Sequence, residues 1–186
     1  MRVLMLEPPP ELIEDRHRKG LDRFDEVWDG VLHMVPPPSH WHQKIERELL
    51  KVLEPLARQR GLDYLHEAGL YRSDQNYRVP DLMVFRPEHG SDRGVEAHAE
   101  VVIELLSPHD ESREKLPFYE SLGVKEVFLI DPGTRAVELF ALRGSRLVAV
   151  PADGDGVFRS AVLGLELRSV AGPRLRLSWD GGSAEI

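Results

Sequence analysis

Short apolar runs alternate with polar segments rich in proline and glycine along most of the chain. A run of about four to eight apolar residues bounded by turn residues is typical of a buried strand. The most apolar runs predict strands at residues 77–85, 100–106 and 125–131. The run within 100–106 is so apolar that it indicates a central strand covered on both faces.

Helical periodicity marks other segments. Residues 39–60 predict a long helix, because Ser39 is a suitable N-cap and Gly61 a suitable stop, with apolar residues recurring every three or four positions. Shorter helices are expected at 11–19 and 110–122, each followed by a glycine. The apolar stripe of the long helix consists of Ile45, Leu49, Leu50, Val52, Leu53 and Leu56.

Further short strands complete the pattern. An Asp-Gly pair at 29–30 and a Gly-Ser pair at 144–145 suit tight turns and predict hairpins. Residues 86–98 are expected to form a charged loop, and the C-terminal part short strands and a frayed tail. Together the elements predict an α/β fold, a mixed and largely antiparallel central sheet flanked by helices, in a single domain over residues 1–186. The additional strands are expected at 24–27, 31–35, 63–68, 70–71, 135–142 and 147–150.

Two carboxylates interrupt the predicted strands. Asp81 follows a proline at the start of V-P-D-L-M-V-F, and Glu104 lies inside the apolar run V-V-I-E-L-L. A carboxylate on a covered strand loses solvation, or keeps a proton with a raised pKa, unless a cation or donor meets it. A metal ion held between Asp81 and Glu104 would account for both. The alternatives are a strand-start turn for Asp81 and a buried Arg partner for Glu104.

Composition narrows the function classes. The formal net charge of -8 argues against a generic nucleic-acid binder, although it allows a local basic groove or a metal. No apolar run approaches the ~20 residues of a membrane helix, and the absence of cysteine excludes disulfides and favours a cytoplasmic location. The 14 prolines, many charges and few amides fit a thermophilic source or a GC-rich genome.

The H-W-H sequence at 40–42 lacks a third ligand at a recognisable spacing, so zinc is not predicted there and His42 is expected on the helix surface.

Several fragments occur in a characteristic order. V-P-D-L-M-V-F is followed by V-V-I-E-L-L-S-P, E-K-L-P-F-Y and G-V-K-E-V-F-L-I-D-P, while F-D-E-V-W-D-G and P-P-P-S-H come earlier. Over residues 24–140 these fragments resemble the Uma-two family of restriction-endonuclease-like proteins, a branch of the PD-(D/E)xK nuclease fold. The resemblance implies that fold and metal-dependent hydrolysis of phosphodiester bonds, with DNA as the expected substrate.

The resemblance also implies roles for particular residues. Asp81 and Glu104 would hold Mg2+ or Mn2+ through hard oxygen ligands. The plain nuclease motif has a lysine two residues after the glutamate, where this chain has Leu106. In the Uma-two pattern the lysine lies on the following helix, and Lys115 matches it, with Tyr119 one turn later on the same face. Outside such a family, Tyr119 is more often a core residue.

Other positions match the family less closely. The family usually has an aspartate four residues before the helix lysine; Glu111 stands there, so either Glu111 or Asp110 would take that role. Glu26 matches an acidic position, as a further ligand, and His40 a histidine position, as a general base or phosphate contact. Without the resemblance, Glu111 and Lys115 would form an ordinary ion pair on a helix surface.

The leading prediction is therefore a Mg2+-dependent endonuclease, which would act as a homodimer if it cuts both strands of a duplex. The main alternative is a catalytically silent nuclease-fold module that binds or regulates. The acidic charge, Leu106 and the short segment between Glu104 and Lys115 favour that alternative. A third possibility is a metal hydrolase of small phosphodiesters.

Overall fold

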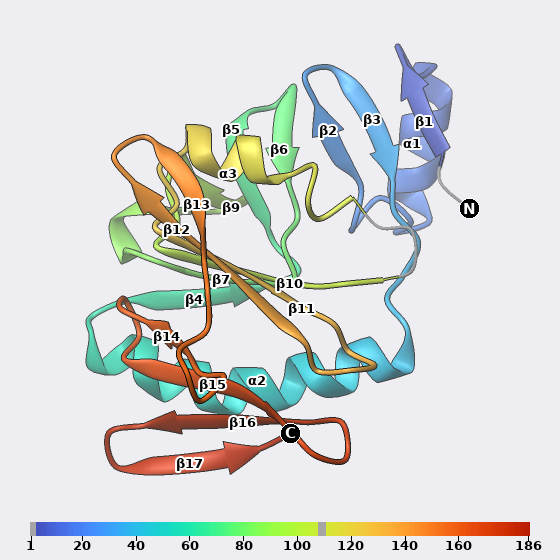
Figure 1. Cartoon of the computed structure of the whole chain (residues 1–186). Helices are drawn as coiled ribbons and strands as arrows, with labels where there is room; N and C mark the ends of the chain where they lie inside the picture. The colour runs from blue at the N-terminus through green and yellow to red at the C-terminus, as the bar shows by residue number, and fades with distance from the viewer. Residues whose placement is uncertain (1–2, 108–110) are drawn as a thin grey trace.

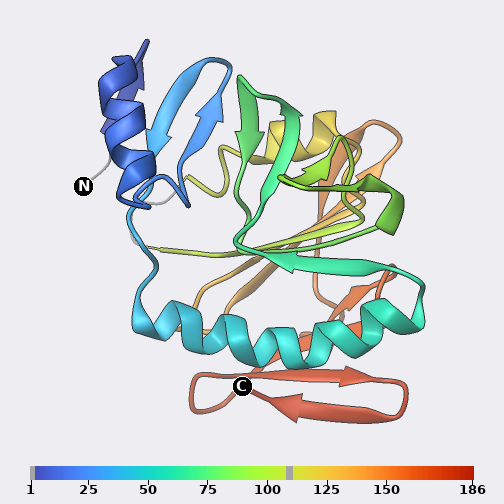
Figure 2. The same ribbon diagram turned by 180° about the vertical axis from the view of Figure 1, so that it is seen from behind.

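The computed structural model describes residues 3–107 and 111–186, which form three β-sheets, three α-helices and one short 3-10 helix (Figure 1). In Figure 1 the N-terminal sheet lies above the six-stranded sheet, and the C-terminal sheet lies below it. Helix α2 (His40–Gln59) runs beneath the six-stranded sheet, as Figure 2 shows from behind. In the described part of the chain, no helix is long and apolar enough to cross a membrane.

The six-stranded sheet forms the centre of the fold. Its strand β10 (Val101–Leu105) pairs antiparallel with β7 (Leu82–Phe85) and parallel with β11 (Glu126–Ile130). Every residue of these strands is buried, because structure covers both faces of the sheet. The sheet is completed by β4 (Asp63–His66), β12 (Val137–Arg143) and β13 (Arg146–Val150), in the order β13-β12-β11-β10-β7-β4.

The seven-stranded N-terminal sheet is built around hairpins. Its turn between β2 and β3 uses Asp29 and Gly30, both with positive φ (47° and 88°), as a two-residue hairpin turn requires. Helix α1 (Pro10–Arg18) connects the first strand to this hairpin, and 3-10 helix η1 (Pro87–His89) precedes the last two strands. The strands are β1 (Val3–Leu6), β2 (Glu26–Trp28), β3 (Val31–Met34), β5 (Gly69–Ser73), β6 (Asn76–Arg78), β8 (Gly90–Ser91) and β9 (Gly94–Glu96).

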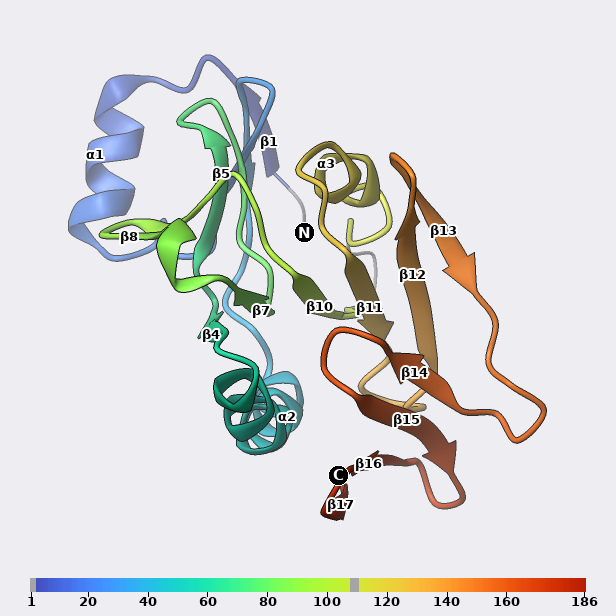
Figure 3. The same ribbon diagram turned by 90° about the vertical axis from the view of Figure 1, so that its left-hand side faces the viewer.

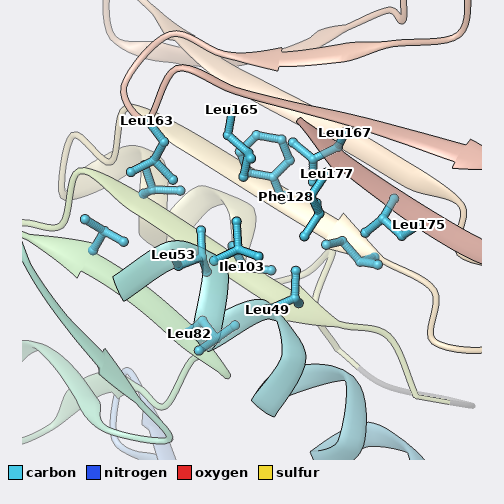
Figure 4. Packing of buried hydrophobic residues seen from close by; sticks show 14 of the residues in the cluster. Leu49, Leu53, Leu82, Ile103, Phe128, Leu163, Leu165, Leu167, Leu175 and Leu177 are labelled. Carbon is cyan, nitrogen blue, oxygen red and sulfur yellow. The ribbon is translucent and has the colours of Figure 1, made fainter. Parts of the chain in front are cut away.

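Two hydrophobic clusters lie on opposite faces of the six-stranded sheet. Figure 4 shows the first, in which Leu49 and Leu53 of α2 meet Ile103 and Phe128 of the sheet and leucines of the C-terminal strands. The second packs Tyr119 and its neighbours on α3 (Leu116–Ser121) against the other face. The sheet is therefore sandwiched, as Figure 3 shows from the side. The C-terminal sheet consists of β14 (Phe158–Ser160), β15 (Leu165–Val170), β16 (Arg174–Trp179) and β17 (Gly182–Glu185).

The structure confirms the mixed α/β class with mostly antiparallel sheets and the long helix, whose Ser39 hydroxyl accepts a hydrogen bond from the His42 N–H (3.2 Å). Other expectations were wrong. The expected strand 77–85 is two strands, β6 and β7, in different sheets, and the loop 86–98 contains β8 and β9. In the described part of the expected helix 110–122, residues 111–122, only Leu116–Ser121 are α helical. The C-terminal part forms the expected short strands, but the chain ends on strand β17 instead of a frayed tail.

Glu126 joins the central sheet to the C-terminal sheet. Its buried carboxylate accepts hydrogen bonds from the backbone N–H groups of Ala161 (2.7 Å) and Val162 (3.3 Å) and from the hydroxyl of Ser160. These donors lie at the last residue of β14 and in the turn that follows it. One carboxylate on β11 thus fixes the approach of the C-terminal strands to the core.

We expect Glu126→Gln to lower the free energy of unfolding by about 1–3 kcal/mol, because a neutral amide has one acceptor oxygen instead of two and forms weaker hydrogen bonds to the buried donors than a carboxylate does. Urea denaturation measures this change. Glu138→Gln, on the neighbouring strand with an exposed carboxylate, is the matched control and should change stability by at most about 0.5 kcal/mol. Equal effects of the two substitutions would contradict the anchoring role of Glu126.

Candidate functional site

A cleft of about 670 Å³ lies between the N-terminal hairpins, the start of β7, the end of β10 and the beginning of α2. Residues 78–82 cross from the seven-stranded to the six-stranded sheet at this place. One wall is apolar and contains the consecutive prolines 36–38. The polar lining consists of Glu26, Ser39, His42, Glu67, Asp81, Glu104, Ser107, Glu111, Ser112 and Lys115.

Lys115 is held between two buried carboxylates. Its Nζ lies 2.8 Å from Glu26 Oε1 and 3.1 Å from Glu104 Oε1. Burial lowers the pKa of Lys115, but the two carboxylates outweigh it, so the pKa is raised and the ammonium stays charged. Lys115 lies at the start of α3, immediately before its first residue, and therefore reaches the cleft from a different element than either carboxylate.

Glu26 acts as an acceptor for several donors. Its Oε1 accepts from the Val79 N–H (2.9 Å) as well as from Lys115, and its Oε2 accepts from the Trp28 Nε1–H (2.7 Å). Both lone pairs of Oε1 are therefore engaged, one of them by the Lys115 ammonium. This geometry favours Glu26 as the group that positions Lys115 rather than as a metal ligand.

Glu104 lies on the face of β10 that packs against α3. The Tyr119 hydroxyl donates a hydrogen bond to Glu104 Oε1, the same oxygen that contacts Lys115, so neither contact engages Oε2. Burial raises the pKa of Glu104 to about 8, despite the opposing effect of the Lys115 ammonium. Burial also raises the pKa of Tyr119, which therefore remains a protonated donor.

Asp81 stands at the point where the chain enters β7. Its Oδ2 accepts from the Leu105 N–H (2.6 Å), and its Oδ1 lies 3.1 Å from Nε2 of His42. Burial lowers the pKa of His42, but the hydrogen bond and charge of Asp81 more than offset this effect, so the pKa is raised. The Asp81 charge also raises the pKa of Glu104, which indicates that the two carboxylates are close enough to interact.

Further contacts support the mouth of the cleft. Nδ1 of His33 lies 3.0 Å from Glu111 Oε2, and the His33 ring stacks on Trp28 with 4.1 Å between centroids. The Arg78 guanidinium lies between the rings of Trp28 and Phe118, 4.2 Å from each centroid. These contacts tie the N-terminal hairpins to the segment that carries Lys115.

The structure gathers most of the predicted site residues at the cleft: Glu26, Asp81, Glu104, Glu111 and Lys115 line it, and Tyr119 contacts Glu104. His40 is exposed and packs against the Trp41 ring instead. Asp110, the alternative to Glu111, lies outside the described residues.

His42 is buried and contacts Asp81, so the expectation that it lies on the helix surface was wrong. A signal was available in the sequence. His42 precedes Ile45 by three residues and Leu49 by seven, which places it on the buried stripe of α2. Sequence reasoning grouped it with His40 because the two are near in the chain, although they lie on different faces of the helix.

The residues present fit a divalent metal ion. Asp81 and Glu104 supply carboxylate oxygens, the ligands that Mg2+ and Mn2+ prefer, from neighbouring strands at one cleft. Glu104 Oε2 is not used by Lys115 or Tyr119, and each Asp81 oxygen retains a second lone pair. A bound cation would also relieve the repulsion between these carboxylates.

Comparisons with known proteins agree on the family and the fold. The sequence model of the Uma2 family, described as "Putative restriction endonuclease", matches residues 14–171. A crystal structure of "a putative nuclease belonging to DUF820 from Anabaena variabilis ATCC 29413" is similar to this chain with a TM-score of 0.61 and 19% sequence identity, over 75% of this chain and 82% of that chain. At this identity the likeness concerns the fold. None of the curated proteins matches the sequence.

The raised pKa of Glu104 predicts a pH effect on stability in metal-free buffer. Between pH 4.5, the ordinary value, and about 8, the folded protein keeps the Glu104 proton while the unfolded chain releases it. The free energy of unfolding should therefore fall as pH rises through this window, by about 1 kcal/mol per pH unit. Glu104→Gln should flatten this slope in urea denaturation, whereas exposed Glu88→Gln should preserve it. Identical slopes in wild type and Glu104→Gln would show that Glu104 is ionised in both states.

Proposed function

Because the chain belongs to the Uma2 family, which is described as "Putative restriction endonuclease", we propose that it is a metal-dependent nuclease that hydrolyses phosphodiester bonds in DNA. The observation that carries this proposal is the buried contact of Lys115 with Glu104 (3.1 Å), in the cleft that Asp81 also lines. Two carboxylates on neighbouring strands with an ammonium beside them are the groups that metal-assisted phosphodiester hydrolysis requires. We also propose that β7, β10 and β11 form the core of a restriction-endonuclease-like fold.

Asp81 and Glu104 would hold the ion, Mg2+ or Mn2+. When bound, such an ion polarises a phosphate and makes a water a stronger nucleophile at neutral pH. The protein contributes rigid placement of the carboxylates: Asp81 is fixed by the Leu105 N–H and Glu104 by the Tyr119 hydroxyl. Because both supports belong to packed elements, the ligands need little reorganisation before the reaction.

Lys115 would stabilise the negative charge that develops on the phosphate oxygens in the transition state. Leu106 occupies the position of the usual motif lysine, and Lys115 brings an ammonium to Glu104 from the start of α3. Glu26 keeps this side chain extended and charged. A lysine at the start of α3 can replace a lysine on the strand of Glu104, because the flexible lysine side chain can place its ammonium at the same point from either element.

His42 is a further candidate for a proton-transfer role. Its contact with Asp81 orients the ring and raises its pKa, which favours the protonated imidazolium. Nδ1 of His42 is buried and has no hydrogen-bond partner among the described residues. A water or substrate oxygen would satisfy this atom, so the histidine could exchange a proton at the cleft.

A second candidate function is a nuclease-fold module that binds without cleaving. The acidic excess at the cleft favours it, because Glu26, Glu67, Asp81, Glu104 and Glu111 line the same space. Without a cation this lining would repel a phosphate backbone. Metal binding and DNA cleavage, measured together, therefore separate the two functions.

We expect wild-type protein to bind Mn2+ and to gain about 2.7 kcal/mol of unfolding free energy at a free Mn2+ concentration 100 times Kd. Asp81→Asn and Glu104→Gln should abolish both effects, because each removes a charged ligand. Calorimetry and thermal unfolding measure them, with exposed Asp155→Asn as the matched control. Wild-type protein that binds no Mn2+ would rule out the nuclease mechanism.

Lys115→Met should reduce Mn2+-dependent cleavage of duplex DNA by roughly 100-fold or more, mainly in kcat, because the ammonium acts on charge that develops in the transition state. Gel assays of nicking and linearisation measure the rate. Exposed Lys51→Met, on α2, is the matched control. Thermal unfolding must first show that Lys115→Met is folded at the assay temperature, because it leaves Glu26 and Glu104 without their cation.

Two outcomes would contradict this assignment. A cleavage rate that survives in Lys115→Met would remove Lys115 from the reaction. Salt-sensitive DNA binding without cleavage, in wild-type protein that does bind Mn2+, would favour the binding module.

A further inference from the structure

A separate group of potential metal ligands lies beside the cleft. Glu46, His66 and Glu67 each offer one ligand atom, and these atoms all lie within 4.8 Å of one another. Glu46 is buried on α2, one turn after His42, while His66 ends β4 and Glu67 follows it. Asp81 and Glu104, the ligands proposed above, are not members of this group.

The geometry of the group suits one ion. Nδ1 of His66 lies 2.9 Å from Glu46 Oε1. Two ligand atoms on one tetrahedral ion, each at about 2.1 Å, lie roughly 3.4 Å apart. A small opening of this hydrogen bond would therefore admit the ion between the two side chains.

Glu67 provides an independent indication of a missing ligand. Its side chain is only 5% exposed, and Oε1 is buried without a hydrogen-bond partner among the described residues. Oε2 accepts from Arg23 Nη2 (2.8 Å), and the Glu67 N–H donates to the Asp81 carbonyl (3.0 Å), so the residue is fixed at both ends. A buried carboxylate oxygen without a donor costs free energy, which a cation at this point would recover.

We propose that Glu46, His66 and Glu67 form a second metal site, which takes a transition ion of the Zn2+ class. An imidazole nitrogen with two carboxylates suits Zn2+ or Co2+ better than Mg2+, which prefers oxygen ligands alone. The half-exposed His66 side chain gives the ion a route from solvent. Since Glu67 also lines the cleft, the ion would add positive charge to an acidic wall. The site does not depend on nuclease activity.

Zn2+ calorimetry in a large excess of Mg2+ tests this site, with Co2+ absorption in the visible as a second readout. Wild type should bind one Zn2+ per chain. His66→Gln and Glu67→Gln should each weaken binding by roughly tenfold or more, since loss of a ligand costs at least as much as loss of a ligand's supporting partner. Glutamine at 67 retains an oxygen for Arg23, and His66 is half exposed, so both variants should remain folded.

The controls locate the ion. His17→Gln removes an exposed histidine that also contacts a carboxylate, Asp22, and should leave Zn2+ affinity unchanged. Asp81→Asn removes a negative charge that acts on Glu46 and should weaken Zn2+ binding only slightly, by less than either ligand substitution. Absence of Zn2+ binding in wild type, undiminished binding in both His66→Gln and Glu67→Gln, or loss of binding in Asp81→Asn or His17→Gln would each overturn the proposal.

Discussion

Desolvation of the Glu104 carboxylate is the constraint on which the rest of the site depends. A strand buried on both faces has no water to offer this group, so the protein must supply a proton, a donor or a cation. Tyr119 and Lys115 meet this requirement from α3, and Glu26 in turn holds Lys115 from the N-terminal sheet. The contacts that the Glu104 carboxyl group requires thereby connect the central sheet, the short helix α3 and the N-terminal hairpins.

The cleft follows from the break in the chain between β6 and β7. If residues 77–85 formed one continuous strand, the N-terminal sheet would extend the central sheet instead of turning away from it. The break occurs at Val79 and Pro80, and the proline cannot donate to a sheet ladder. Within the described part of the chain, the Val79 N–H has no strand partner at this break and donates a hydrogen bond to the Glu26 carboxylate instead. The residue that positions Lys115 therefore also stabilises the connection between the two strands. The architecture and the chemistry of the site share one carboxylate.

The sequence predicted the elements that local patterns determine, such as α2, the hairpin at Asp29 and the apolar strand around Glu104. It could not predict the separation of β6 from β7, because pairing partners are distant in the chain and the apolar run continues through the proline. The C-terminal sheet was underestimated because its short strands become stable only when their leucines pack against α2. The strand pattern itself singled out Asp81 and Glu104, and the family resemblance brought Glu26 and Lys115 into consideration. It did not identify His42 or Glu67, whose proximity to Asp81 arises from packing between α2, β4 and β7.

The proline wall of the cleft has a consequence for how an anion can be oriented. Prolines 36–38 have no N–H, and each ring restricts φ, so this wall presents a preformed surface without backbone donors. It cannot hold a phosphate, and little conformational entropy is lost there when a ligand arrives. An anionic group must therefore turn away from the prolines and toward the polar part of the lining, which includes Lys115. If the proposed nucleic-acid substrate binds in this cleft, its sugars or bases would lie against the prolines and its phosphates toward Lys115.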